Sequence, residues 1–276
     1  MQPMPALVYF DTDCFHHLAS TFACHPLQDD LRDKILFSPV TMMEVLSHLA
    51  REWGASVHKQ LRGLHNWVVT GHALVLPWME SAISQIGFGI VQEDEEYTKN
   101  LQADLHACVS SQLSELRDVA KARDSQLLQV KQTYAKYFQD TVDYFRSTGL
   151  TEEVFTVVWL KGLTRRAGLK SATRPVAQVV AALSALHEFE YNKLIMALGD
   201  RRYNAQKHRN DLFDAEQLIY LGNPSLHFLT VDRGYLPKIT KSPQRKRVHE
   251  VPVTLLADAR RAEILLRQIT TEAHAG

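Results

Sequence analysis

The stretch ALVYFDTD, residues 6–13, decides how the fold of this chain is interpreted. An apolar run rich in strand-forming residues stops abruptly at Asp11, which is typical of a short buried strand that ends in a turn. A second short strand is expected at 35–37, ILF. Ser38 and Pro39 then have the residue types of an N-cap and a first helical position, so a helix is expected to follow. The N-terminal part therefore alternates between strand and helix.

The same alternation is expected to continue along the chain and to return in its last third. The helix after Pro39 should extend to about Trp67, before a strand within LVLPW at 74–78. Residues 212–221 are predicted to be helical, 226–231 to form a strand, and 251–256 to form a last strand before a terminal helix. Short strands that alternate with helices predict an α/β fold with a mostly parallel sheet.

The middle of the chain has a different pattern. Between Gly89 and Gly149 there is no glycine or proline, and apolar residues recur at spacings close to 3.6. This predicts one very long helix, or a hairpin of two helices that breaks near 121–126. Further helices are expected to start at Thr151 and to run from about Thr173 to Gly199. The predicted domains are a discontinuous α/β domain (1–89 and 200–276) and an all-helical insertion (90–199).

Composition excludes several classes of protein. The 276 residues contain 31 basic and 31 acidic side chains, and 45% are hydrophobic, which excludes intrinsic disorder and collagen. No apolar run approaches the ~20 residues that a membrane span needs. The start lacks the basic segment of a secretory signal, and Cys14, Cys24 and Cys108 show no metal-type spacing. We therefore expect a cytoplasmic protein with reduced thiols and no membrane partner.

Four carboxylates occur where a ligand site would form. Asp11 and Asp232 each follow a predicted strand, and ligands of open α/β sheets bind beyond the carboxyl ends of the strands. Glu44 lies one turn into the helix after Pro39, and Asp214 lies in the helix before the strand at 226–231. Each position alone has an ordinary explanation as a turn residue or a helix-terminal charge. Together the four would repel one another unless a cation neutralised them, and an all-oxygen site suits Mg²⁺ or Mn²⁺.

The order of these motifs resembles a known family. A strand ending in Asp11, SPVTMMEV with Glu44, NDLFDAEQL with Asp214 and FLTVDRGYL with Asp232 are together similar to the PIN domain of metal-dependent ribonucleases. The resemblance covers about residues 6–80 and 205–256. It implies that these four acids are catalytic and hold one or two Mg²⁺ or Mn²⁺ ions. It also implies phosphodiester hydrolysis, usually of RNA, that leaves a 5′-phosphate and a 3′-hydroxyl.

Three further positions have two interpretations each. Asp13 stands where many relatives carry asparagine, and it either adds a metal ligand or caps the following helix. Asp211 is either an N-cap or an additional ligand. Thr230 matches a small hydroxyl residue common in the family before the last acid, and it is otherwise an ordinary strand threonine. The helical segment is not part of a minimal PIN domain.

Basic residues suggest where nucleic acid would bind. The loop with Lys241, Arg245, Lys246 and Arg247 is expected to flank the acids and contact phosphates, with Thr230 nearby. The expected function is thus that of an endoribonuclease. The helical segment is expected to dock RNA, an inhibitor or partner protein, or a second copy of the chain.

Three alternatives remain open at this point. The first is a DNA-directed nuclease of the same fold, because a carboxylate site contacts phosphate rather than the 2′-hydroxyl. The second is a catalytically silent PIN-like module that binds RNA or protein. The third is a haloacid-dehalogenase-type phosphatase with Asp11 as nucleophile and Asp13 as general acid. That family also needs a lysine and a late acidic pair, and it leaves Glu44 and Asp214 unexplained.

Overall fold

The computed structural model describes residues 6–22, 27–51, 74–91, 99–100, 103 and 113–272. The structural statements that follow concern these residues. The part of the expected helix beyond residue 51 lies outside them, as do Cys24 and Cys108. Cys14 is fully buried in the core.

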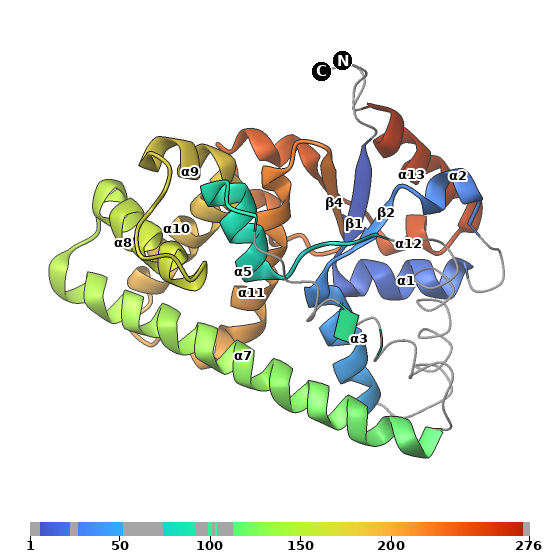
Figure 1. The fold of residues 1–276 in the computed structure, drawn as a ribbon, viewed down its shortest axis with the longest axis horizontal. Coiled ribbons are helices and arrows are strands. Elements are labelled where there is room, and N and C mark those ends of the chain that lie inside the picture. The colour runs from blue at the N-terminus through green and yellow to red at the C-terminus, as the bar shows by residue number, and fades with distance from the viewer. Residues whose placement is uncertain are drawn as a thin grey trace.

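A parallel sheet forms the centre of the molecule (Figure 1). Its strands are β1 (Leu7–Phe10), β2 (Ile35–Phe37), β3 (Leu74–Val75), β4 (Leu226–Thr230) and β5 (Val248–Glu250), in the order β3-β2-β1-β4-β5. All four neighbouring pairs are parallel, and Tyr9 of β1 pairs with Phe228 of β4. The predicted α/β class with a parallel sheet is therefore confirmed. β1 and β4 are apolar and largely buried because central parallel strands are covered on both faces.

The prediction of a last strand at 251–256 is wrong. The last strand is β5, and residues 253–256 form the short helix α12 (Val253–Leu256). The Val251 N–H still donates to the Thr230 carbonyl at 2.9 Å, but Pro252 has no N–H with which to continue the pairing. The pairing therefore ends at the proline, which is the N-cap of α12.

Helices pack around the sheet, and their starts follow the expected capping chemistry. The helices near the sheet are α1 (Thr12–Phe22), α2 (Asp29–Arg32), α3 (Pro39–Arg51), α5 (Met79–Ala82, continued by a π-helical turn Ile83–Gly87) and α13 (Ala259–Glu272). The Ser38 hydroxyl accepts the Thr41 N–H at 3.1 Å, so the predicted cap of α3 is confirmed.

The middle of the chain is helical where it is described. Its elements are α7 (Leu113–Thr148), α8 (Glu152–Arg166), α9 (Val176–Ala182) and α10 (Ser184–Gly199). Residues 121–126 lie within α7 without a break, so the single long helix is the correct alternative for this stretch. The Thr151 hydroxyl caps α8 as expected, by accepting the Val154 N–H at 3.2 Å. The helix predicted from Thr173 to Gly199 is divided at Leu183 into α9 and α10.

The helix expected at 212–221 is built from two kinds of turn. The chain passes from a 3₁₀ turn (Ala205–His208) into α11 (Arg209–Asp214) and then into a 3₁₀ helix (Ala215–Gly222). Two more 3₁₀ segments, Leu236–Lys238 and Pro243–Arg247, lie on either side of the loop before β5.

The helical segment shares its core with the sheet. α7 packs against α3 and α11 and runs across the molecule below the sheet in Figure 1. Phe155, Trp159 and Leu163 of α8 belong to the same continuous cluster of buried side chains as Val8 and Phe228 of the strands. The helices therefore support the sheet directly.

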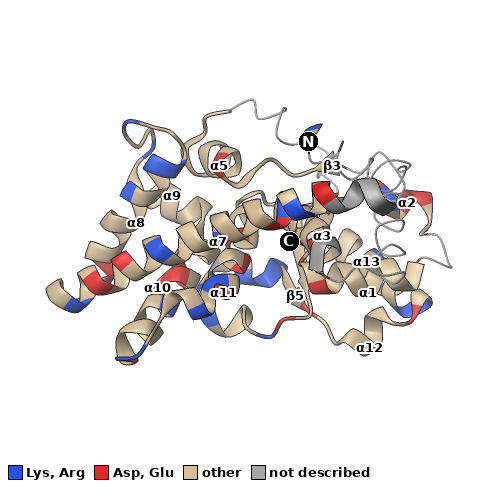
Figure 2. Ribbon diagram, turned by 90° about the horizontal axis from the view of Figure 1, so that it is seen from below, with Lys and Arg blue, Asp and Glu red and all other residues tan. Residues whose placement is uncertain are grey.

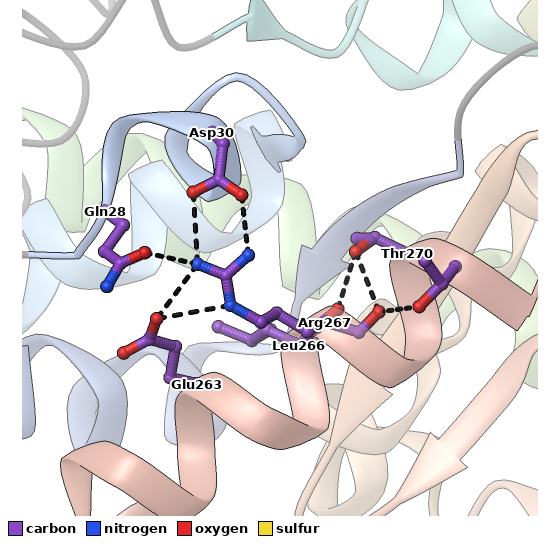
Figure 3. Close-up of polar contacts among 7 residues, drawn as sticks. Gln28, Asp30, Glu263, Leu266, Arg267 and Thr270 are labelled. Carbon is purple, nitrogen blue, oxygen red and sulfur yellow. Dashed lines mark hydrogen bonds and ion pairs between the residues drawn. The ribbon is translucent and has the colours of Figure 1, made fainter.

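At the opposite end of the molecule, Arg267 links α13 to α2. Its guanidinium donates to both Asp30 oxygens, at 2.6 and 3.2 Å, and also contacts Gln28 and Glu263 (Figure 3). The Arg267 side chain is 39% exposed and that of Asp30 56%, so solvent and salt screen this pair. We therefore infer that the Arg267–Asp30 ion pair orients α13 and contributes little to the free energy of unfolding.

A histidine pair between β4 and β5 is expected to make the fold sensitive to acid. His227 Nδ1 and His249 Nε2 share a hydrogen bond of 2.9 Å, and burial lowers the pKa of His227 to about 4, with His249 and Arg247 lowering it further. A histidine with a lowered folded-state pKa stabilises the fold above about pH 6.5, and this contribution is lost as pH falls toward 4. Urea unfolding of wild type should thus show less stability at about pH 5 than at about pH 7, and His227→Phe should reduce this difference. The control is His17→Gln on α1, which is not part of this histidine pair and should lose as much stability as wild type. An equal loss in wild type and His227→Phe would contradict the prediction.

Candidate active site

One pocket at the carboxyl ends of β1 and β4 is lined by the four predicted acids. Asp11 directly follows β1, Asp232 follows β4, Glu44 lies on α3 and Asp214 is the last residue of α11. These side chains border a cavity of about 230 Å³. The parallel sheet brings the two strand ends to one edge, and α3 and α11 add a carboxylate each. Residues more than 200 positions apart are thereby placed around one space.

Asp11 is held in a fixed position. Its Oδ1 accepts the Cys14 N–H at 2.6 Å, so Asp11 caps α1, and its Oδ2 accepts a short hydrogen bond from the Thr230 hydroxyl. Burial raises the pKa of Asp11 to about 7, and repulsion from Asp13 and Asp232 adds to this, while the two hydrogen bonds oppose it. The charged form of this carboxylate is therefore costly without a cation nearby.

Asp214 and Glu44 repel each other across the pocket. Burial raises the pKa of Asp214 well above its ordinary value, and the Glu44 carboxylate raises it further. Glu44 itself forms an ion pair with the ammonium of Lys131 at 2.6 Å, and it accepts a short hydrogen bond from the Thr12 hydroxyl. Lys131 also opposes the rise in the pKa of Asp214, so its charge acts on both carboxylates.

Lys131 lines the pocket although no sequence pattern singled it out, and the same holds for Thr12 and Tyr235. Lys131 extends from α7, is only 8% exposed, and also donates to Asn210 Oδ1 at 3.2 Å. Its place on the helix indicates that it is buried, because Leu127 and Ala135, four residues before and after it on the same helix face, are buried apolar residues. A lysine on a buried stripe is uncommon unless it is paired. The prediction that residues 90–199 form a separate insertion places Lys131 away from the acids, whereas the packing of α7 on α3 brings it to them.

The carboxylates do not converge as a ready metal centre. Among the described residues, no three acidic, histidine or cysteine side chains are arranged so that they could hold a metal ion. Glu44 is directed to Lys131, and Asp232 Oδ1 accepts the Gly234 N–H at 2.7 Å. The donor type and the mutual repulsion suit a hard divalent cation. Only the ligand type therefore suits such an ion, and Glu44 would have to turn from Lys131 for the four carboxylates to share it.

Comparison with known proteins identifies no relative. No family model matches the chain, and searches of curated proteins and of solved structures found no significant match. None of the described helices is long and apolar enough to cross a membrane. The function is therefore argued from the pocket itself.

The two additional acids lie in different surroundings. Asp13 is exposed in the first turn of α1 and lines the pocket. Asp211 does not line the pocket. Its Oδ2 instead forms an ion pair with the ammonium of Lys193 at 2.7 Å. Asp211 is also not an N-cap, because His208 takes that position in α11. The chain enters the helix through a 3₁₀ turn, which moves the helix start upstream of the expected position.

The basic loop does not flank the acids. Residues 243–247 directly precede β5, so they lie at the opposite edge of the parallel sheet, and the expectation that they border the pocket is wrong. The loop follows β4, which ends beside the acids, but it crosses to the other edge of the sheet before β5 begins. Arg247 has a structural role, since its guanidinium donates to the carbonyls of Leu221, Asn223 and Leu226. Lys241, Arg245 and Lys246 are exposed.

Thr230 is likewise unsuited to contact nucleic acid. It is fully buried, and its hydroxyl bonds Asp11 while it accepts the Asp232 N–H at 2.9 Å. It therefore connects the two acids at the strand ends.

Figure 2 shows Lys and Arg interspersed with Asp and Glu over α7, α8 and α10, without a broad region of one sign in that view.

Proposed function

We propose that this chain is a Mg²⁺- or Mn²⁺-dependent endoribonuclease with a PIN-like architecture. The observation that carries the proposal is that Asp11, Glu44, Asp214 and Asp232, drawn from four elements, line one pocket at the carboxyl edge of a parallel sheet. The buried position and raised pKa of Asp11 support it, because a divalent cation would relieve the repulsion there. In this proposal residues 90–199 are the insertion, and RNA is the partner.

The residues around the acids have positioning roles. Thr230 and the Cys14 N–H orient Asp11, the Thr12 hydroxyl orients Glu44, and the Tyr235 hydroxyl donates to the Asp214 carbonyl at 3.0 Å. A divalent ion shared by the four acids would supply acidified water and neutralise charge on the phosphate. Lys131 neutralises Glu44 in the metal-free pocket. It is the one Lys or Arg among the described residues that line the pocket, so its ammonium would face a substrate phosphate bound there.

Cleavage assays on a panel of substrates test the proposal. Labelled single-stranded RNA, structured RNA and DNA are incubated with the full chain in Mn²⁺, Mg²⁺ or EDTA. We expect RNA to be cut only with metal, leaving 5′-phosphate ends. Cleavage of DNA alone would favour a DNA nuclease, and RNA binding without cleavage would favour a silent binding module. Hydrolysis of a phosphomonoester alone would favour the phosphatase that uses Asp11 and Asp13. Each of these outcomes would contradict the proposal.

Replacing Lys131 should expose its competition with metal. In Lys131→Met the methylene part of the side chain remains while Glu44 loses its ion pair, so the metal-free protein should lose about 1–3 kcal/mol of stability. Saturating Mn²⁺ should then raise the melting temperature more than in wild type, because no ammonium competes for Glu44. Differential scanning fluorimetry with Mn²⁺ or EDTA measures both effects.

A matched control is Lys136→Met on the same helix, where the side chain is 76% exposed. This variant should behave as wild type in both conditions. If Mn²⁺ stabilised Lys131→Met no more than wild type, the proposal that Lys131 and the metal compete for Glu44 would be wrong.

A further inference from the structure

A second cavity lies in the helical segment, separate from the acidic pocket. It measures about 250 Å³, and α7, α8 and α10 provide most of its lining. A cavity of roughly 150 Å³ already admits benzene, so this one has room for a small organic molecule. Its walls are mainly aromatic: Tyr134, Tyr137, Phe138, Phe155, Trp159 and Phe189.

The polar groups of this cavity are incompletely paired. Glu80 Oε2 and Arg166 Nε are buried and make no hydrogen bond, whereas the buried Trp159 Nε1 interacts with the Glu190 carboxylate. Buried polar atoms without partners are uncommon in folded proteins, and here two of them belong to residues that line one cavity. A ligand that brings both a positive centre and an oxygen acceptor would satisfy the Glu80 carboxylate and the Arg166 N–H donor.

The charges around the cavity favour a cation. Three basic residues line the cavity: Arg166 is engaged by Glu216 through two hydrogen bonds, Lys193 pairs with Asp211, and Arg165 is exposed. Glu80 lies 3.9 Å from the same Arg166 guanidinium. Among the described residues no Lys or Arg forms an ion pair with Glu190. Burial raises the pKa of Glu190 to about 7, and repulsion from Glu216 adds to it. A bound cation would relieve this cost.

The aromatic walls suit the same ligand. Rings of tryptophan, tyrosine and phenylalanine attract ammonium groups through their electron-rich faces, and methylated ammonium ions are the usual guests of such cages. Tyr137 is 45% exposed, and a Cβ at Gly162 would lie only 2.1 Å from its hydroxyl. The Tyr137 ring therefore packs against α8 at Gly162, and its exposed part lies at the solvent side of the cavity.

We propose that this cavity is a binding site for a small organic ammonium ion that also carries a hydroxyl oxygen. Glu80 and Glu190 face its charge, the aromatic rings surround its methyl or methylene groups, and the Nε–H of Arg166 donates to its oxygen. The site is independent of the acidic pocket and of any nuclease activity.

Isothermal titration of the full chain with three probes tests the proposal. The probes are choline, tetramethylammonium, and neohexyl alcohol, in which carbon replaces the charged nitrogen of choline. We expect choline to bind at least about tenfold more tightly than the alcohol, with tetramethylammonium between them. Equal binding of choline and the alcohol would show an apolar cavity only, and absence of choline binding up to about 10 mM would show no site; either result would overturn the proposal.

Two variants locate the binding. Glu190→Gln removes a carboxylate whose charge is costly in the free protein, so it should fold, and it should weaken choline binding about tenfold or more. Tyr137→Leu changes a half-exposed ring and should weaken binding without unfolding the chain. The matched control, Glu153→Gln, alters an exposed carboxylate on α8 and should bind as wild type. Unchanged affinity in Glu190→Gln would also overturn the proposal.

Discussion

Replacing Asp11 by asparagine is expected to lower RNA cleavage about a thousandfold. Asparagine has nearly the same shape, and its side-chain oxygen can still accept the Cys14 N–H that caps α1. The variant lacks the negative charge at the centre of the pocket, which in our proposal holds the divalent ion. Initial rates with labelled RNA in saturating Mn²⁺ measure the loss.

Stability separates this loss from unfolding. Because burial raises the pKa of Asp11 to about 7, ionising it near neutral pH costs folding free energy, and the neutral amide avoids this cost. The metal-free Asp11→Asn protein should therefore be at least as stable as wild type, while the Mn²⁺-induced rise in melting temperature should disappear. Asp33→Asn, an exposed aspartate between α2 and β2, is the control and should leave both readouts unchanged. Full activity in Asp11→Asn would show that the pocket is not the catalytic site.

Replacing Arg166 by methionine is expected to destabilise the fold by about 3–5 kcal/mol. Arg166 of α8 donates to both Glu216 oxygens, at 3.0 and 2.5 Å, and lies 4.6 Å from the centre of the Tyr134 ring. Glu216 is fully buried, so the variant leaves an uncompensated charge in the core. The pair joins α8 to the 3₁₀ helix Ala215–Gly222 beside the sheet, and urea unfolding would measure its loss.

Two further variants assign the effect to the charge. Arg165→Met changes the exposed neighbouring arginine and should cost little stability. The double variant Arg166→Met with Glu216→Gln should recover a large part of the loss, because it no longer buries an unpaired carboxylate. If Arg166→Met were no less stable than Arg165→Met, the buried pair would not be what joins the helical segment to the sheet.

Much of the α/β framework could be predicted because its signals are local. β1 and β4 are apolar runs that end near an aspartate, and β2 matches its predicted bounds. Ser38 and Thr151 cap the helices that follow them, since a side-chain oxygen at an N-cap needs only the next turn as its partner. A parallel sheet then follows from the alternation of strands and helices.

The last strand could not be placed in this way. The residues at 251–256 are apolar, but only three residues, Val248–Glu250, pair with β4, and their pairing depends on a strand some 20 residues earlier in the chain. The basic loop was expected near the acids because it follows β4, but its residues 243–247 lead directly into the parallel strand β5 and so lie at the other edge of the sheet. A short edge strand is defined by its neighbour rather than by its own pattern.

The sequence by itself determined that Asp11 and Asp232 follow parallel strands and that Glu44 and Asp214 lie on adjoining helices. Only the tertiary structure decided how these charges are paired. Lys131 reaches Glu44 across 87 residues because α7 packs on α3, and it neutralises the carboxylate that would otherwise face the other acids. The reason is physical: strand ends and caps depend on nearby residues, whereas the partner of a buried charge depends on which helices pack together.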